Sequence, residues 1–267
     1  MYPSLARSYK GIFPFKLGTT SFIYPDHYVP NVRMLGPYLD EIELLLFESL
    51  PADALPSKAV IAELFHLAHK YDLTYNIHLP TDVSITDPKP EKQQQAVDTL
   101  VDVIDRVSPL APAAYTLHIP FTETSFENAA VKEWQNRVFN NLEKMLAGGI
   151  AAESIAVETL DYRFDLLNDI LAGLNLSVCL DIGHLIAYGY DLKALFDKYV
   201  DITAIIHLHG VKSGRDHLAL NKLPAEFIDP LLSMLKRFTG SVSLEVFSFE
   251  DLEISLGFLE NQAHFIK

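Results

Sequence analysis

The chain has 267 residues, of which 49% are hydrophobic and 21% charged, the balance of a packed soluble protein. Acidic residues outnumber basic ones by 35 to 21, and the net charge of −14 disfavours nucleic-acid partners, which need basic surfaces. No apolar stretch reaches the roughly 18 residues that span a bilayer. Residues 1–16 also lack the apolar core of a secretory signal, so we expect a cytoplasmic protein without a membrane partner. The single cysteine, Cys179, lies in an apolar run and predicts a buried thiol.

From Leu17 onward, short β-branched runs alternate with longer segments of helical spacing, which is typical of βα units. The predicted strands are 17–23, 41–47, 75–79, 114–119, 154–160, 176–182, 202–209 and 241–247. The predicted helices are 57–71, 91–107, 126–146, 164–174, 192–199, 224–237 and 249–262, and the helix after the first strand is the least defined. Eight strands without a linker predict a single α/β domain over 1–267, a (β/α)₈ barrel with a lead-in segment at 1–16. Its active site should lie at the C-terminal ends of the strands.

Ionisable residues end six consecutive predicted strands. They are His78, His118, Glu158, Asp181 with His184, His207, and Glu245. One such histidine alone would most often be a core residue, but six matching positions favour a metal centre. The three carboxylates lie in apolar strands without lysine or arginine, and a buried carboxylate needs a cation nearby.

Histidine and carboxylate ligands suit zinc, manganese or iron. The set exceeds what one four-coordinate ion requires, so we predict two or more divalent ions. Such clusters activate water and stabilise charge on phosphoryl oxygens, which indicates hydrolysis of a phosphoester. In the stretch IIHLHGVK, His207 and His209 share one face of a strand, so their spacing does not decide which of them binds metal.

The motifs HLP, HIP, ET, LDIGH, HLHGVKS and LE resemble the xylose isomerase-like superfamily, which includes sugar isomerases, epimerases and apurinic-site endonucleases. The resemblance implies a principal ion on Glu158, Asp181, His207 and Glu245. In endonuclease members, positions matching His78, His118, His184 and His217 add further ligands. His207 matches the ligand histidine, which lies five residues before a lysine, here Lys212.

The endonucleases also carry an Asp-x-His pair after the seventh strand. Arg215 stands where that aspartate is expected, and Asp216 directly precedes His217. The resemblance therefore implies a third ion only if Asp216 substitutes through a shift of the loop by one residue.

The segment KLGTTSFIYPDHYVPNVRMLGPYLDEIELLLFE resembles a narrower branch, the cobamide-remodelling phosphodiesterases. This implies a small-molecule substrate, a cobamide (a vitamin B12-type corrinoid), cleaved at the phosphoribosyl bond of its nucleotide loop. Glu158 and Glu245 would be catalytic, and Lys212 or Arg215 would offset phosphoryl charge. The expected substrate contacts are Thr19, Thr20, Ser21 and Tyr24, and His209 is expected either to contact the substrate or to orient a metal ligand.

Other functions stay open. In a sugar isomerase or epimerase, Glu158 and Glu245 would move a proton between carbons, which leaves His78 and His118 without a necessary role. A DNA endonuclease is disfavoured by the charge, and a non-catalytic corrinoid-binding or metal-storing module is disfavoured by the intact ligand set.

Overall fold

A computed structural model describes residues 2–50 and 54–266. Eight parallel strands form a closed barrel in the order β1-β10-β7-β6-β5-β4-β3-β2. The strands are β1 (Lys16–Thr20), β2 (Glu41–Leu45), β3 (Thr74–His78), β4 (Tyr115–Leu117), β5 (Ile155–Glu158), β6 (Ser177–Asp181), β7 (Thr203–Leu208) and β10 (Ser241–Leu244). The predicted barrel and all eight of its strands are confirmed, with most strands one to three residues shorter at their C-terminal ends than expected.

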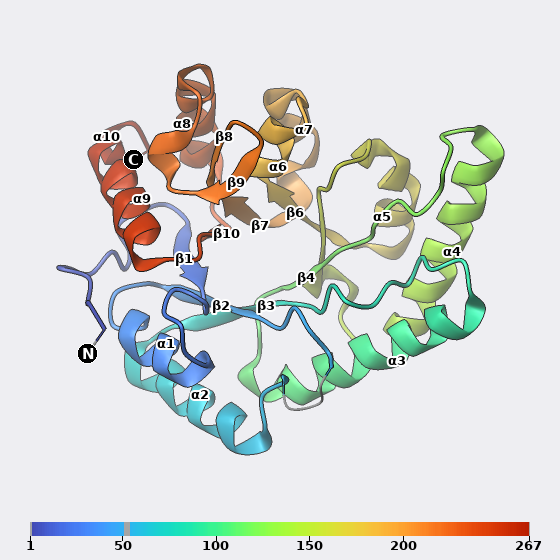
Figure 1. Cartoon of the computed structure of the whole chain (residues 1–267), viewed down its shortest axis with the longest axis horizontal. Coiled ribbons are helices and arrows are strands. Elements are labelled where there is room, and N and C mark those ends of the chain that lie inside the picture. The colour runs from blue at the N-terminus through green and yellow to red at the C-terminus, as the bar shows by residue number, and fades with distance from the viewer. Residues whose placement is uncertain (1, 51–53, 267) are drawn as a thin grey trace.

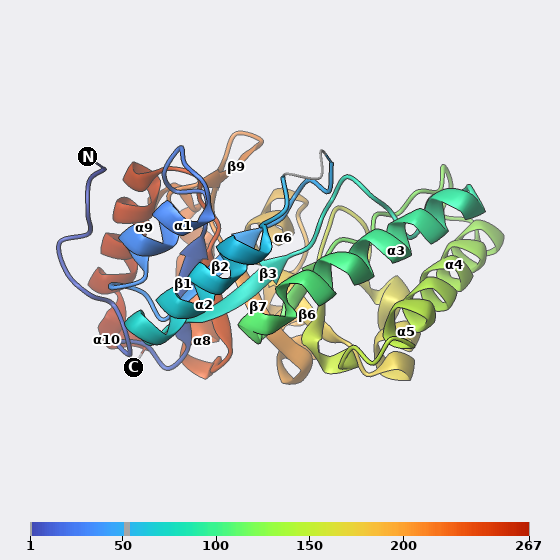
Figure 2. The ribbon, with the colours of Figure 1, turned by 90° about the horizontal axis from the view of Figure 1, so that it is seen from below.

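Helices surround the barrel, with α3 and α4 on one side and α8, α9 and α10 on the other (Figures 1 and 2). They are α1 (Tyr28–Leu35), α2 (Lys58–Tyr71), α3 (Pro90–Val107), α4 (Asn128–Leu146), α5 (Asn168–Leu174), α6 (Ile182–Ala187), α7 (Leu192–Tyr199), α8 (Ile228–Arg237), α9 (Phe249–Asn261) and α10 (Ala263–Ile266). Local signals fix several starts: the Ser57 side chain caps α2, and Pro90 opens α3. The predicted helices 164–174 and 224–237 begin as 3₁₀ turns.

Successive side chains along each strand point alternately toward the surrounding helices and into the barrel interior, so the buried residues form two layers. Ile42 and Leu44 of β2 belong to the large hydrophobic core that also includes helix residues, whereas Glu43 between them faces the barrel interior and contacts His207. A smaller cluster of Ala114, Ala156, Cys179 and Ile205 is separate from the large core. Cys179 is a buried free thiol, as expected.

A helix and a hairpin beside the predicted site were not expected from the sequence. Helix α6 follows β6 directly, and a two-stranded antiparallel hairpin, β8 (Gly210–Lys212) and β9 (Arg215–Leu218), follows β7. Both lie at the end of the barrel where the ionisable residues gather. Within the described residues, every helix is too short or too polar to cross a bilayer.

Candidate metal centre

The ionisable residues predicted for the site meet at the C-terminal ends of the strands. His78, Glu158 and Asp181 are the last residues of β3, β5 and β6, while His118 and Glu245 directly follow β4 and β10. His207 is the next-to-last residue of β7. All except His118 are buried, although their strands carry no basic residue to neutralise the carboxylates.

The first group consists of His78, His118 and Glu158, which could hold one metal ion. Glu158 Oε2 lies 3.0 Å from His118 Nε2 and 3.4 Å from His78 Nε2. Since His78 Nδ1 lies 3.0 Å from the Leu79 carbonyl, we assign its proton to Nδ1, which leaves a lone pair on Nε2. A lone pair that faces a carboxylate requires a cation or a second proton. Burial opposes the charge on His78, but Glu158 raises its pKa.

The second group consists of Asp181, His207 and Glu245. His207 Nδ1 lies 3.3 Å from Glu245 Oε2, 3.5 Å from Glu158 Oε2 and 3.9 Å from Asp181 Oδ2. His207 Nδ1 and Glu245 Oε2 are both buried without a hydrogen-bond partner. Buried polar atoms without a partner are rare. Their convergence on one point between three carboxylates fits a divalent ion.

Glu158 belongs to the first group and also forms candidate ligand sets with Cys179 and His207 and with Asp181 and His184. Its Oε2 atom faces His78 and His118 on one side and His207 on the other, and its Oε1 atom lies 3.3 Å from His184 Nδ1. Burial acts to raise the pKa of Glu158, but the nearby histidines His118 and His207 hold it well below its ordinary value. This carboxylate is therefore ionised and placed to bridge two cations.

Glu43 is a site residue that the sequence analysis missed. Its carboxylate is buried in β2, and its Oε1 atom lies 2.9 Å from His207 Nε2. Burial acts against ionisation, but His207 lowers the pKa of Glu43, so that His207 Nε2 carries the proton and Nδ1 is free to bind metal. A carboxylate behind a metal-binding histidine commonly sets its tautomer. The detectable signal was a second carboxylate two residues after Glu41 in an apolar strand.

The junction of β6 and α6 explains the LDIGH motif. The Asp181 side chain caps α6, because its Oδ1 atom accepts a hydrogen bond from the His184 amide at 2.7 Å. The cap orients both side chains toward the centre. Burial opposes the charge on His184, but Asp181 and Glu158 raise its pKa to about 10. Gly183 lies against the His209 ring, and any side chain there would overlap the imidazole.

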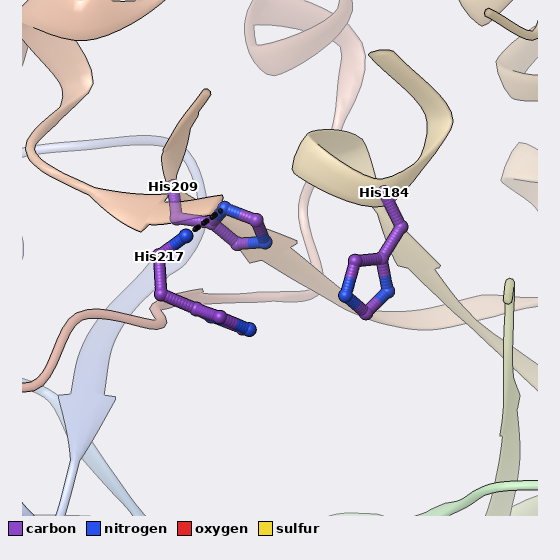
Figure 3. Close-up of side chains that lie close together, drawn as sticks. All are labelled: His184, His209 and His217. Carbon is purple, nitrogen blue, oxygen red and sulfur yellow. Dashed lines mark hydrogen bonds between the residues drawn. The ribbon is translucent and has the colours of Figure 1, made fainter. Parts of the chain in front are cut away.

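His209 lies behind the ligands and is not exposed to a substrate. Its Nδ1 atom accepts a hydrogen bond from the His217 amide at 2.9 Å, so the proton is on Nε2, which lies 3.1 Å from Asp181 Oδ1. Figure 3 shows this hydrogen bond from the His217 amide to the His209 ring, with His184 beside the pair. His184, His209 and His217 form a third histidine group that could hold an ion. The tautomer nevertheless makes His209 a donor to Asp181, which corresponds to the ligand-orienting one of its two expected roles.

The β8–β9 hairpin carries a β-bulge that changes the geometry expected from its sequence. Gly210 pairs with Leu218 and Lys212 pairs with Arg215, so that only Val211 opposes both Asp216 and His217. His217 has a positive φ of 51°, and Asp216 Oδ2 lies 4.0 Å from His184 Nε2. The extra residue of the bulge therefore places two consecutive residues, Asp216 and His217, opposite Val211, and Asp216 approaches His184.

The cavity above the carboxylates has a volume of about 430 Å³. Its walls are formed by the described residues Phe47, Glu48, His78, Thr81, Asp82, His118, Glu158, His184, His217, Glu245 and Phe247. Lys212 and Arg215, which were expected to contact phosphoryl oxygens, are exposed on the hairpin and do not line this cavity.

The four hydroxyl-bearing residues expected to contact substrate are buried, two at the end of β1 and two in the loop that follows it. Thr19 and Thr20 donate to the carbonyls of Leu244 and Val246 at 2.8 and 3.0 Å. Ser21 accepts from the Leu45 amide, and Tyr24 donates to the Pro3 carbonyl at 2.7 Å. These hydroxyls satisfy backbone groups, and the structure does not bring them to the cavity.

Comparisons with known proteins agree with this architecture. A probable endonuclease 4 from Nitrosopumilus maritimus (strain SCM1) is 24% identical over 152 residues, which span 51% of this chain and 54% of that protein. The crystal structure of a D-tagatose 3-epimerase-like protein superposes with a TM-score of 0.78 at 19% identity and covers 94% of this chain and 98% of its own. A structure of the IOLI protein with a bound zinc atom superposes with a TM-score of 0.68 at 16% identity over 94% of this chain and 96% of its own.

The structural similarities are to proteins below 25% identity and show the fold alone, and the chain spans only about half the length of the curated endonuclease. The family assignment rests instead on a model that matches residues 32–263, a range that contains seven of the eight barrel strands. The chain belongs to the xylose isomerase-like TIM barrel family.

Proposed function

We propose that this chain is a metal-dependent phosphodiesterase that hydrolyses the phosphoribosyl bond in the nucleotide loop of cobamides. The observation that carries the proposal is the sharing of Glu158 between two ligand groups. Its Oε2 atom faces His78 and His118 at 3.4 and 3.0 Å and His207 at 3.5 Å. This arrangement suits adjacent divalent ions, the kind of centre that serves phosphoester hydrolysis.

Each residue has a defined task in this reaction. Divalent ions in the centre would supply an activated water and stabilise charge on the phosphoryl oxygens. Glu158 and Glu245 would hold ions close to the phosphorus, and Glu43 keeps the proton of His207 on the atom that faces away from them. We further propose that His184, Asp216 and His217 hold a third ion, since the bulge supplies the carboxylate that the spacing lacks. Lys212 and Arg215 would meet the substrate outside the cavity.

The substrate assignment rests on the N-terminal resemblance and on charge. The cavity wall contains Glu48 and Asp82, and the chain carries a net charge of −14, so a polyanion is disfavoured. In the proposed reaction, the oxygen of water adds to phosphorus and the bond from phosphorus to the ribose oxygen breaks. The ribose oxygen takes a proton, and the products are cobinamide phosphate and the lower-ligand nucleoside.

The test is incubation of the purified protein with a cobamide, with zinc, manganese or iron supplied in turn, followed by chromatography of the corrinoids. We expect cobinamide phosphate from the wild type and none from Glu158→Gln, which keeps the size of the side chain but removes the bridging charge. Absence of a corrinoid product with all three metals would refute the proposal.

A sugar isomerase or epimerase is the second candidate, because Glu158 and Glu245 approach His207 Nδ1 from different strands and could exchange a proton with a bound sugar. Incorporation of solvent deuterium into a ketose would favour this function. We expect no incorporation with ketoses or their phosphates, because His78 and His118 would serve no purpose in that reaction.

A further inference from the structure

Exposed aromatic side chains gather around the mouth of the barrel. Among the described residues, Phe22, Phe126, Tyr188 and Phe247 are between 38% and 62% exposed. Each lies in a loop that follows a barrel strand or, for Tyr188, the short helix α6 after β6. Single exposed apolar residues are ordinary, but a group at the active-site end of a barrel indicates a binding surface.

Two of these side chains adjoin the metal centre directly. The Tyr188 ring centre lies 6.0 Å from that of His184, and the Phe247 ring centre lies 4.9 Å from that of His217. The two histidine rings are themselves 5.8 Å apart. The four rings therefore form a continuous row along the side of the centre built by α6, the hairpin and the loop after β10.

The size of the cavity requires such a surface for any large substrate. A volume of about 430 Å³ corresponds to roughly 14 water-sized groups at about 30 Å³ each, enough for one ribose and one phosphate. The rest of a larger molecule must lie outside, across the loops. Since the outer ends of the row are aromatic rings, this region suits a broad apolar face and not a second charged group.

We propose that Tyr188 and Phe247 form an apolar subsite for a broad, uncharged part of the substrate, while the phosphodiester lies over the carboxylates. The inference rests on the proposed function, in which this part is the face of the corrin ring. The side chains set specificity by contact area, and they take no part in bond cleavage.

Binding and turnover test the subsite separately. Cobinamide, a corrinoid without the nucleotide loop, reports on the subsite alone, and its affinity is measured by equilibrium dialysis with Tyr188→Ala, Phe247→Ala and the double variant. We expect each substitution to weaken binding about tenfold, which corresponds to about 1.4 kcal/mol. Tyr188→Phe should bind as the wild type does. Phe65→Ala is the matched control, since Phe65 is 47% exposed on α2, away from the mouth.

With substrates, kcat/KM for a cobamide should fall at least tenfold more in the double variant than kcat/KM for p-nitrophenyl methyl phosphate, a small diester. The loss should lie mainly in KM. If the double variant binds cobinamide as tightly as Phe65→Ala does, the inference is overturned. Equal losses of kcat/KM for the cobamide and the small diester would overturn it too. If cobinamide binds and responds to the substitutions but no cobamide is cleaved, the subsite stands and the proposed function fails. If the cobamide is cleaved but the substitutions have no effect, the proposed function stands and the subsite fails.

Discussion

His209 offers the sharpest test of the centre. It shares a strand face with His207, but both of its ring nitrogens have hydrogen-bond partners, whereas His207 keeps one nitrogen without a partner. His207 presents an unpartnered Nδ1 to three carboxylates, whereas both nitrogens of His209 are engaged by the His217 amide and Asp181. His207→Ala removes a ligand and should abolish the ion of the second group. His209→Ala removes a group that orients a ligand, which typically lowers metal affinity 10- to 100-fold without eliminating binding.

His209→Ala should also lower the free energy of unfolding. Without the imidazole, the His217 amide loses its acceptor, at about 1–3 kcal/mol for an unsatisfied donor, and Asp181 retains the His184 amide. The measurements are metal content after dialysis against defined free zinc, and urea denaturation. At saturating zinc, His209→Ala should keep its full metal content. Equal loss of metal in the two variants would refute the assigned roles.

Gly183 provides an independent check by a double-mutant cycle. A methyl group at position 183 would overlap the His209 ring, so Gly183→Ala should displace His209 and lower metal affinity much as His209→Ala does. In the His209→Ala background the methyl has space, and Gly183→Ala should then be nearly neutral. A coupling of about 1–3 kcal/mol is expected for such a contact. Additive effects would show that Gly183 has another purpose.

Three further predictions concern individual carboxylates. Glu43→Leu should lower metal affinity about 10- to 100-fold in a zinc titration, because His207 loses the group that fixes its tautomer, and a value within twofold of the wild type would contradict this role. Burial raises the pKa of Glu41 to about 7, so the free energy of unfolding should fall by about 3 kcal/mol as the pH rises from 4.5 to 7, where the unfolded carboxyl ionises and the folded one does not. Glu41→Gln should remove that decrease in urea denaturation, and an unchanged pH profile would count against it. Asp216→Asn should lower the metal content by one ion per chain in elemental analysis while the first two ions remain, and an unchanged ion count would refute the third position.

The barrel was predictable because its signals are local and repeated. Each strand is an apolar, β-branched run of sufficient length, and a buried carboxylate such as Glu158 stands out within it. Helix α6 has only six residues, too few for a helical period to appear. The hairpin was missed because its flanks GVK and RDHL do not alternate in polarity. Its one local signal was the dipeptide Ser213-Gly214, whose φ values of 53° and 74° form the turn.

The surroundings of the hydroxyl groups expected to contact substrate were unpredictable for a different reason. A hydroxyl in a strand can face a ligand or satisfy a nearby carbonyl, and the sequence does not distinguish the two. Thr19 and Thr20 donate to backbone carbonyls at the end of β10. The partners lie more than 220 residues away in the chain, so only the closure of the barrel reveals them.

The hairpin also shows why a departure in motif spacing need not remove a site. Successive residues of a strand point to opposite faces, so an Asp-x-His pair faces one side and a consecutive pair normally does not. Here the bulge places Asp216 and His217 together opposite Val211, and the positive φ of His217 turns the chain back toward the centre. Histidine tolerates that conformation better than most residues, at a cost of order 1–3 kcal/mol. The residue that departs from the expected spacing, Arg215, instead pairs with Lys212 beside the turn. In the proposed third site, the bulge would thus supply the carboxylate from Asp216, although the two residues are one position closer in the chain than in an Asp-x-His pair.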